Sequence, residues 1–437
     1  MKRIPLILLA LCIAGVAAQA DTWNVDQGGA GDFITIQQAI DAAESGDEIV
    51  VSPGTYVENI NFLGKDLHIH SSDGPAMTVI DGGAGLPGSA SCVTMQSGES
   101  LNAILQGFLL TGGLGSTYPG VVEETLIDPM VGGGVYCHNA SGTIIGCRIN
   151  ENQTDYAAGI FVRNATMIIT GCTFESNYAQ TYASAVGGLE SDVTIGGCAF
   201  LSNQAVAGDG AIHLLAPALI SECVFRNNQA RAGGAINVPQ YGADLEIRNC
   251  IFQGNAATGT HGGAIRIHEA GPLVEDCLFI DNHAAVDGGG LLAIDGGSAT
   301  IRNCTFHANG AGRHGGNIAL YDDASPAIRN CIITGAAANG GLFCSFAYPS
   351  LYCNDVWGNT DGDYVGISDP TGADGNISAD PLFCDPEAED FSIDGESPCA
   401  PEHNPACGLI GAFGVGCDEP PTGTNEISWG GLKALFQ

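Results

Sequence analysis

Basic residues are scarce in this 437-residue chain, which has 13 Lys and Arg against 48 Asp and Glu. The formal charge of −35 repels nucleic acid and anionic membranes, so both are excluded as partners. Beyond the N-terminus the chain lacks a run of 18 apolar residues, which excludes a membrane-spanning helix. It also lacks long stretches with a 3.6-residue apolar period, and this argues against a helical solenoid.

The N-terminus has the layout of a secretory signal. Lys2 and Arg3 form a basic region, IPLILLALCIAGV is an apolar run too short to span a membrane, and AQA ending at Ala20 fits a cleavage site. We expect residues 1–20 to be removed and the mature chain, with a charge of about −37, to be secreted or to lie at a bacterial cell surface or outer membrane. A buried N-terminal strand is the alternative.

The sequence is rich in glycine, with 64 residues, and contains an internal repeat. An Ile or Val lies three positions before each repeated cysteine, and a Phe or Ile lies two positions after it. Short apolar alternations such as LEIRNCIF, separated by Gly, Asn and Asp, indicate strands and turns. The cysteines recur every 25 to 27 residues, at Cys147, Cys172, Cys198, Cys223, Cys250, Cys277, Cys304 and Cys331. An asparagine follows five positions later at Asn152, Asn177, Asn203, Asn228, Asn255, Asn282 and Asn309.

Several short strands in each repeat, joined by tight bends, predict a parallel β-helix solenoid. Equivalent residues of successive coils then lie above one another at roughly 4.8 Å. We expect the Ile and Phe columns to fill the interior. We expect the Asn column to form a hydrogen-bonded ladder at a bend and to tolerate the left-handed conformation. The repeated cysteines are predicted to pack as small apolar residues, with disulfides or metal binding as the alternatives.

The regularity of the repeat divides the chain. We assign residues 21–140 to an N-terminal cap and the first coils, 141–345 to regular repeats, 346–417 to an irregular closing segment, and 418–437 to a linker and tail. Residues 34–45 fit a short amphipathic capping helix. The remaining cysteines near the closing segment are predicted to pair in an oxidised compartment, with open connectivity: Cys344, Cys353, Cys384, Cys399, Cys407 and Cys417.

The repeats resemble those of a known family. FESN, FLSN, FRNN, FQGN, FIDN and FHAN alternate with GGAI at 233–236 and 262–265, which is similar to the FxxN/GGA[ILV] repeats of chlamydial-type polymorphic outer-membrane proteins. The resemblance implies an all-β fold, a right-handed, single-stranded parallel β-helix of pectin-lyase type. The segment GDFITIQQAIDAAESGDEIVVSPGTYVENI, at 31–60, looks like the N-terminal cap that many such proteins share.

The resemblance does not extend to the C-terminus. Polymorphic outer-membrane proteins end in a translocator barrel, whereas here a linker, DEPPTGT, and the stretch NEISWGGLKALFQ follow the solenoid. We therefore expect no barrel. Residues 425–437 are interpreted as a sorting or docking signal for the outer surface, with a frayed end or an added lid as the alternative.

Pectin-lyase-type folds host lyases, hydrolases, esterases, epimerases and adhesins, so the fold does not decide the function. A glycosidase needs two carboxylates at a defined separation, and a pectate lyase needs calcium-binding acids beside an Arg or Lys. The pectinesterase signature around GxxDFIFG is missing. HGGAIRIH, YDD and NTD occur in the opposite order to the polygalacturonase motifs that they resemble.

One column of polar residues is a candidate catalytic site. The position before each Gly-Gly pair reads Ala232, His261, Asp287, His314 and Asn339 on successive coils. Two imidazoles and a carboxylate at this spacing, with Arg313 adjacent, can hold a divalent transition metal or perform acid–base chemistry. Ordinary polar residues at a solvated bend are the alternative.

A second column carries acids, at Gln240, Glu269, Asp295 and Asp322. Three stacked carboxylates repel one another, and bound calcium would relieve that repulsion with suitable oxygen ligands. A solvated turn is the alternative. A third column, two positions before the cysteines, reads Arg248, Glu275, Arg302 and Arg329, which predicts a surface ion-pair ladder.

These observations favour a secreted or surface-associated protein that is used for adhesion or glycan binding without catalysis. Its partner would be a polysaccharide or a cell-surface glycan. The alternative is a polysaccharide-active enzyme, either a calcium-assisted polyuronide lyase or a glycoside hydrolase that uses coils 250–330. A structural solenoid without a specific ligand is the third hypothesis.

Overall fold

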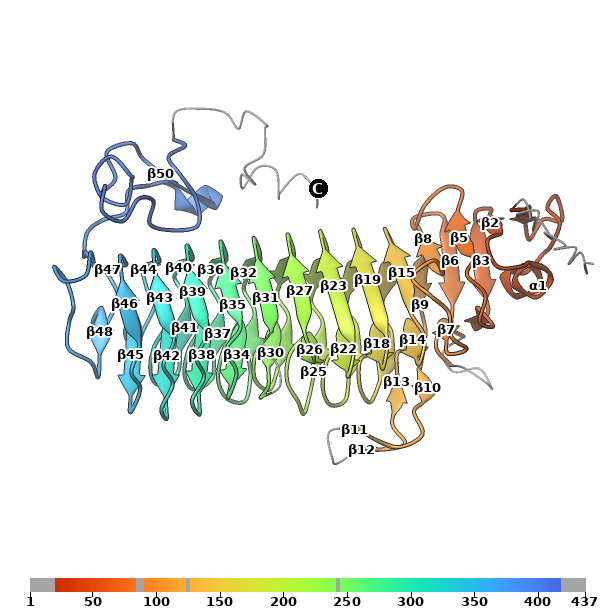
Figure 1. The fold of residues 1–437 in the computed structure, drawn as a ribbon, viewed down its shortest axis with the longest axis horizontal. Coiled ribbons are helices and arrows are strands. Elements are labelled where there is room, and N and C mark those ends of the chain that lie inside the picture. Colours follow the sequence, from red (N-terminus) through yellow and green to blue (C-terminus); the bar gives the residue numbers. More distant parts are fainter. Residues whose placement is uncertain (1–19, 84–89, 123–125, 241–243, 418–437) are drawn as a thin grey trace, which may run out of the picture.

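The computed structural model describes residues 20–83, 90–122, 126–240 and 244–417. There the chain winds into a long parallel β-helix of about 13 coils, confirming the predicted fold (Figure 1). The predicted secretory signal and the docking segment 425–437 lie outside the described residues, apart from Ala20. In the described part of the chain no helix is long and apolar enough to cross a bilayer.

Each regular coil contributes one strand to each of four parallel sheets, which we name A to D. The 13 strands of sheet A are β1 (Thr22–Val25), β2 (Glu48–Val51), β5 (His68–Ser71), β8 (Ile104–Gln106), β15 (Gly142–Ile145), β19 (Thr166–Thr170), β23 (Asp192–Gly196), β27 (Ala218–Ser221), β31 (Leu245–Arg248), β35 (Leu273–Glu275), β39 (Thr300–Arg302), β43 (Ala327–Arg329) and β46 (Ser350–Tyr352). The 12 strands of sheet B are β3 (Gly54–Val57), β6 (Thr78–Asp81), β9 (Leu109–Thr111), β16 (Arg148–Asn150), β20 (Thr173–Glu175), β24 (Ala199–Leu201), β28 (Val224–Arg226), β32 (Ile251–Gln253), β36 (Leu278–Ile280), β40 (Thr305–His307), β44 (Ile332–Thr334) and β47 (Asp355–Trp357).

Sheets D and C complete each coil. The narrow sheet D has β17 (Gln153–Thr154), β21 (Tyr178–Ala179), β25 (Gln204–Ala205), β29 (Gln229–Ala230), β33 (Ala256–Ala257), β37 (His283–Ala284) and β41 (Gly310–Ala311). Sheet C has β4 (Ile60–Asn61), β7 (Val93–Met95), β14 (Val135–His138), β18 (Ile160–Arg163), β22 (Val186–Leu189), β26 (Ile212–Leu215), β30 (Ile236–Val238), β34 (Ile265–His268), β38 (Leu291–Ile294), β42 (Ile318–Tyr321), β45 (Leu342–Ser345) and β48 (Tyr364–Val365). Three antiparallel pairs lie outside these sheets: β10 (Ser116–Thr117) with β13 (Met130–Val131), β11 (Val121–Val122) with β12 (Leu126–Ile127), and β49 (Phe383–Asp385) with β50 (Asp390–Ile393).

The helix α1 (Ile36–Ala42) caps the first coil, as predicted, but is shorter than residues 34–45. The hydroxyl of Thr35 accepts a hydrogen bond from the Gln38 amide and starts the helix. Ala43 has extended backbone angles, which end it. The buried residues Ile36, Ala39 and Ile40 lie on one face, so the helix covers the apolar end of the solenoid.

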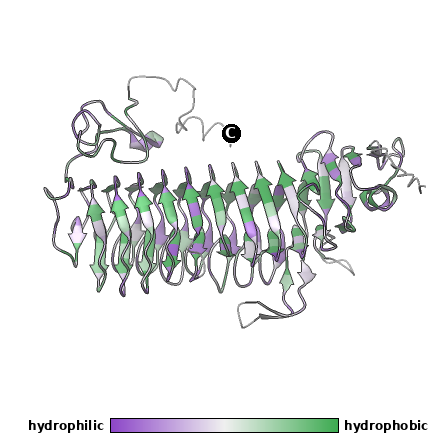
Figure 2. Cartoon of the chain, viewed as in Figure 1, coloured by the Kyte–Doolittle hydropathy of each residue, from purple (hydrophilic) through white to green (hydrophobic). Residues whose placement is uncertain are grey.

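The interior consists of the predicted columns. The rings of Phe174, Phe200, Phe225, Phe252, Phe279 and Phe306 stack face to face with centroids 4.4–4.8 Å apart. The repeated cysteines are buried free thiols, which confirms the packing interpretation and contradicts the disulfide alternative. Figure 2 shows the most hydrophobic colouring on the strands of the long sheets. Apolar burial of these columns holds the coils together.

The asparagine ladder forms at the bend between sheets B and D. The side-chain amide of Asn228 donates to the Phe200 carbonyl at 2.8 Å and to Asn255 Oδ1 at 3.0 Å, and the same contacts recur in the neighbouring coils. The prediction that the asparagines adopt the left-handed conformation is wrong. The preceding residue does so, as at Asn227 with a φ of 58°, because the asparagine must point inward to bond the next coil.

The Gly-Gly pairs have two separate roles. Gly262 has a φ of 70°, where a Cβ would also meet the Ile265 carbonyl oxygen at 2.5 Å. A Cβ on Gly263 would lie 2.1 Å from the carbonyl oxygen of Gly289 in the next coil. The first glycine therefore permits the turn, and the second permits the close approach of successive coils.

The closing segment begins with the last coil strands β46, β47 and β48, and its remainder lies along the outside of sheet B. Phe391 is buried against the outward-facing side chains of Val224, Ile251 and Leu278, and the backbone amide of Gly411 donates to the Asn330 carbonyl at 2.9 Å. The prediction that all six nearby cysteines pair is wrong. Disulfides join Cys353 to Cys407 and Cys384 to Cys417, while Cys344 and Cys399 are buried free thiols.

Asp355 is buried beneath this segment. Its Oδ1 accepts a hydrogen bond from the Ala379 amide at 3.0 Å, and the Cys399 thiol donates to its Oδ2 at 3.2 Å. Burial raises the pKa of Asp355 to about 6. Since an unfolded aspartate has a pKa near ~3.9, the folded state favours the protonated carboxyl. This contribution to stability is present below about pH 4 and is lost as pH rises through about 6.

We therefore expect Asp355→Asn to raise the free energy of unfolding by about 2–3 kcal/mol at pH 8 and to leave it nearly unchanged at pH 4. The amide keeps an oxygen for the Ala379 amide and carries no charge. Urea unfolding of both proteins from pH 4 to pH 8 measures the difference. Glu387→Gln, on the exposed surface of the same segment, is the control. A constant difference between Asp355→Asn and the wild type across this range would contradict a titrating Asp355.

Candidate functional site

The predicted His–Asp–His column is a real cluster at the corner between sheets D and C. The backbone amide of Gly262 donates to the Asp287 carbonyl, and that of Gly288 donates to the His314 carbonyl, both at 3.0 Å. Parallel pairing of adjacent coils thus places His261, Asp287 and His314 one above the other, because each is the residue before a Gly-Gly turn. We call these three residues with Arg313 the histidine cluster.

Asp287 is the centre of the histidine cluster. His261 Nδ1 lies 3.1 Å from its Oδ2, and His314 Nδ1 lies 3.4 Å from its Oδ1. Arg313 forms a bidentate pair, with Nε 3.0 Å from Oδ1 and Nη2 2.5 Å from Oδ2. The Asp287 side chain is 0% exposed, whereas that of Arg313 is 55% exposed. Burial opposes ionisation, but hydrogen bonds from His261 and Arg313 lower the pKa of Asp287 below its ordinary value.

Two aromatic residues that sequence reasoning missed complete this corner. The Tyr321 hydroxyl lies 2.9 Å from His314 Nδ1, and the Phe343 ring stacks on the His314 imidazole with centroids 4.2 Å apart. Burial and the Asp287 charge raise the pKa of Tyr321, so the phenol stays neutral. Both residues occupy outward positions of sheet C strands in the coils that carry His314 and Asn339. An aromatic residue at an outward strand position, next to the Gly-Gly corner, was the sequence signal from which both residues could have been predicted.

The geometry determines what the histidine cluster can do. His261 and His314 direct Nδ1 toward the buried carboxylate, while their side chains remain 27% and 39% exposed. Each imidazole is therefore held in orientation and can exchange a hydrogen bond or a proton with a ligand. Asp287 itself is inaccessible. Its carboxylate orients the Arg313 guanidinium and the two imidazoles around it.

The predicted acid column also forms, at the corner between sheets C and A. Glu269, Asp295 and Asp322 have φ values of 51°, 54° and 48°, so each occupies the left-handed turn position after a sheet C strand. His268 Nε2 lies 3.0 Å from Asp295 Oδ2 and 3.8 Å from Glu269 Oε1. The His268 imidazole is therefore in contact with two carboxylates of the column.

Within the described ranges no three His, Cys, Asp or Glu side chains are gathered as metal ligands. The calcium site at the acid column therefore stays a prediction. A melting curve tests it, since bound calcium would raise Tm and EDTA would reverse the rise.

The predicted ion-pair ladder is present on the outer face of sheet A. Glu275 pairs with Arg248 of the preceding coil and with Arg302 of the following coil. Arg329 follows Arg302 in register. Arg248 and Arg302, which both pair with Glu275, stabilise the stack of coils.

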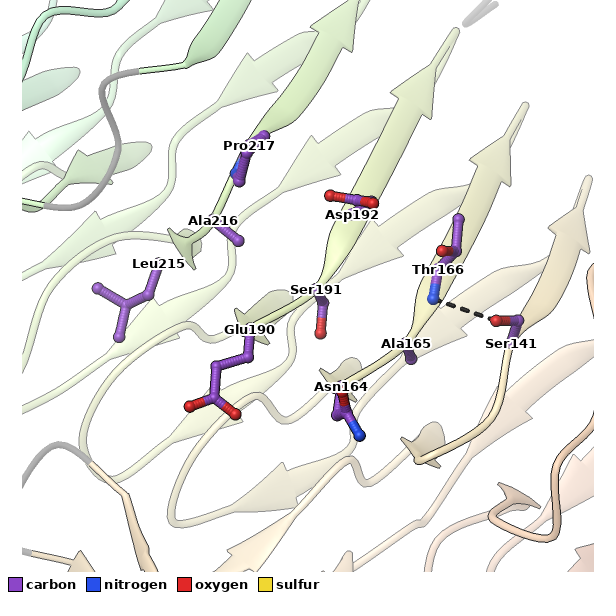
Figure 3. Close-up of a pocket in the computed structure, with 10 residues that line it drawn as sticks. All are labelled: Ser141, Asn164, Ala165, Thr166, Glu190, Ser191, Asp192, Leu215, Ala216 and Pro217. Atoms are coloured by element: carbon purple, nitrogen blue, oxygen red, sulfur yellow. Dashed lines mark hydrogen bonds between the residues drawn. The ribbon is translucent and has the colours of Figure 1, made fainter.

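A groove of about 560 Å³ lies at the corner between sheets C and A in the N-terminal half of the solenoid (Figure 3). Its lining comes from four successive coils, from Ser141 to Pro217. Ala165, Ser191 and Ala216 occupy corresponding corner positions, with Asn164 and Glu190 on the sheet C side and Thr166 and Asp192 on the sheet A side. We call this the corner groove. Its surface presents amide, hydroxyl and carboxylate groups.

No curated protein matches the chain by sequence. Similar solved structures include a pectin methylesterase from carrot (12% identity, covering 85% of this chain and 91% of that chain, TM-score 0.29) and PfbA, a surface adhesin of Streptococcus pneumoniae (13%, 77% and 92%, 0.46). Another is a mannuronic acid-specific polysaccharide family 6 lyase from human gut microbiota (12%, 91% and 96%, 0.42).

The family model for a right-handed beta helix region matches residues 133–287 and 190–356. Together these matches span 133–356, just over half of the 437 residues. The matched region contains the histidine cluster, the acid column and the corner groove. This chain belongs to the right-handed beta helix family.

Proposed function

We propose that this chain is a secreted or cell-surface β-helix protein that binds glycans without catalysis. The observation that supports this proposal is that the Asp287 carboxylate is inaccessible. A glycosidase needs two carboxylates that reach the scissile bond, and the carboxylate of the histidine cluster is fully buried with both oxygens engaged. The exposed edges of His261, His314 and Arg313 offer hydrogen bonds to sugar hydroxyls instead.

Two observations support an extracellular location. Two disulfides hold the closing segment, and such bonds persist in oxidising compartments. The N-terminal sequence has the features of a secretory signal. The FxxN/GGA[ILV] repeats resemble those of polymorphic outer-membrane proteins, which favours a surface role.

A polyuronide lyase is the second candidate function. It is favoured by the pairing of His261 with Asp287, because a carboxylate that orients an imidazole can make the outer ring nitrogen a proton acceptor. Against a calcium-assisted mechanism, Arg313 is held by Asp287, and the acid column is in contact with the imidazole of His268.

Binding and turnover are measured on one panel: polygalacturonate, alginate, xylan and a linear β-glucan. We expect the wild type to be retarded in gels that contain at least one of these polymers and to release no unsaturated uronide or new reducing ends. His314→Ala is expected to weaken the retardation, because it removes an exposed imidazole. Product formation that His261→Ala abolishes would establish the lyase instead, and no retardation by any polymer would overturn the proposed function.

A further inference from the structure

The corner between sheets C and A presents recurring polar groups along the solenoid axis. Successive coils place Asn139, Asn164 and Glu190 at one position, since the Asn139 amide donates to the Arg163 carbonyl and the Asn164 amide to the Leu189 carbonyl. Nearer the C-terminus the same position holds the acid column. Coils repeat at roughly 4.8 Å, close to the length of one hexose unit, so one contact can recur with each sugar.

The charge at this corner selects among glycans. Glu190 and Asp192 line the corner groove, and Glu269, Asp295 and Asp322 lie at the same corner farther along the axis, beyond coils that carry Ala216 and Gln240 there. These groups repel uronates and sulfated sugars, and the overall charge of −35 reinforces that repulsion. Carboxylates accept hydrogen bonds well from neutral hydroxyls. A neutral sugar chain therefore fits the corner.

Two exposed aromatic residues lie at the C-terminal end of this corner, on the last coil. Phe346 is 78% exposed and Tyr348 is 70% exposed, on either side of Ala347. The Asp323 amide donates to the Phe346 carbonyl at 2.7 Å, and the Tyr348 amide donates to the Ala324 carbonyl at 2.8 Å, so both continue the corner of the preceding coil. Large rings this exposed offer apolar faces to a ligand.

Phe346 also has an unfavourable backbone conformation. Its φ of 50° is left-handed, and it is the one aromatic residue among the described positive-φ positions, where Asn139 and Asn164 hold the equivalent place in other coils. A bulky residue there is strained, whereas asparagine is tolerated. Folding alone favours asparagine at position 346. The Phe346 ring therefore indicates a role in binding and not in folding.

We propose that the corner between sheets C and A binds a neutral polysaccharide chain that runs parallel to the solenoid axis and stacks on Phe346 and Tyr348. This inference rests on the proposed glycan binding and assigns it a second surface and a ligand class. The hydroxyls of the sugar donate to the corner carboxylates, and its apolar faces cover the two rings.

Phe346→Asn separates binding from folding, because the two effects have opposite signs. We expect Phe346→Asn to raise Tm, and Phe346→Asn with Tyr348→Ser to weaken binding of a linear neutral β-glucan about tenfold. Isothermal titration with long and short β-glucan chains measures the affinity. Tyr352→Ser, which removes a 51% exposed ring from the outer face of sheet A, is the matched control.

The results distinguish this inference from the proposed function. Tighter binding of the neutral chain than of polygalacturonate, lost in the double variant and kept in Tyr352→Ser, supports the inference. If a panel glycan binds the wild type and the double variant equally, the corner is not the site, although glycan binding stands. If no panel glycan binds the wild type, both proposals fail.

Discussion

Replacing Asn228 with alanine is expected to lower the free energy of unfolding by about 4 kcal/mol. The side chain is 0% exposed and bonds to both neighbouring coils. Its Oδ1 accepts from the Asn203 backbone and side-chain amides at 3.0 Å each. Its amide donates to the Phe200 carbonyl and to Asn255 Oδ1. Alanine would leave several of these groups buried without partners, and each costs about 1–3 kcal/mol.

Gln229 provides a matched control one residue away, because its side chain is exposed. We expect Gln229→Ala to unfold at the wild-type urea concentration and Asn228→Ala to unfold at a much lower one. Hydrogen exchange should place the loss in the coils that contain Asn203 and Asn255, since solenoid coils contact only their neighbours. Equal urea midpoints for the two variants would contradict a stabilising ladder.

Arg313→Ala is expected to lower the free energy of unfolding by about 3 kcal/mol at pH 8. Removing the guanidinium leaves the Asp287 charge buried without its bidentate partner. Urea unfolding of Arg313→Ala and of the wild type at pH 8 measures the difference in the free energy of unfolding.

The variant Asp287→Asn tests whether Arg313 stabilises the protein by pairing with a buried charge or by packing. In an Asp287→Asn background, Arg313→Ala should cost little, and a double-mutant cycle isolates the pair. In the wild type the depressed pKa of Asp287 contributes stability that is present above its unfolded pKa of about 3.9 and is lost as pH falls below that value. Asp287→Asn should remove this part of the acid sensitivity. An unchanged cost of Arg313→Ala in both backgrounds would mean that the guanidinium acts by packing alone.

Most of the solenoid could be predicted from its sequence, because coil-to-coil contacts repeat. Cys250, Phe252 and Asn255 face the same residue types above and below, so an alignment of the repeats is also a map of contacts. For the same reason the histidine cluster could be located, since each member precedes a Gly-Gly turn. The regular spacing of the repeat places them together.

The remaining features depend on contacts between different columns or distant segments. Tyr321 reaches His314 across a corner, which residue spacing alone does not specify. The closing segment contacts sheet B coils more than 100 residues earlier, as Gln253 with Glu389 shows. A signal for that packing was present. Outward positions of sheet B change from Arg148 and Thr173 to Val224 and Ile251, and apolar residues on both faces indicate a covered sheet.

The row of buried cysteines determines whether the protein can refold after it has unfolded. Burial raises the pKa of Cys147 to about 11, and the other thiols of the row are buried too, so they are kept from reagents in the solvent. Unfolding in an oxidising medium would release these thiols beside two disulfides and allow random exchange among them. In such a medium the lifetime of the molecule would be set by its rate of unfolding, because a chain that opens once would be trapped by wrong crosslinks.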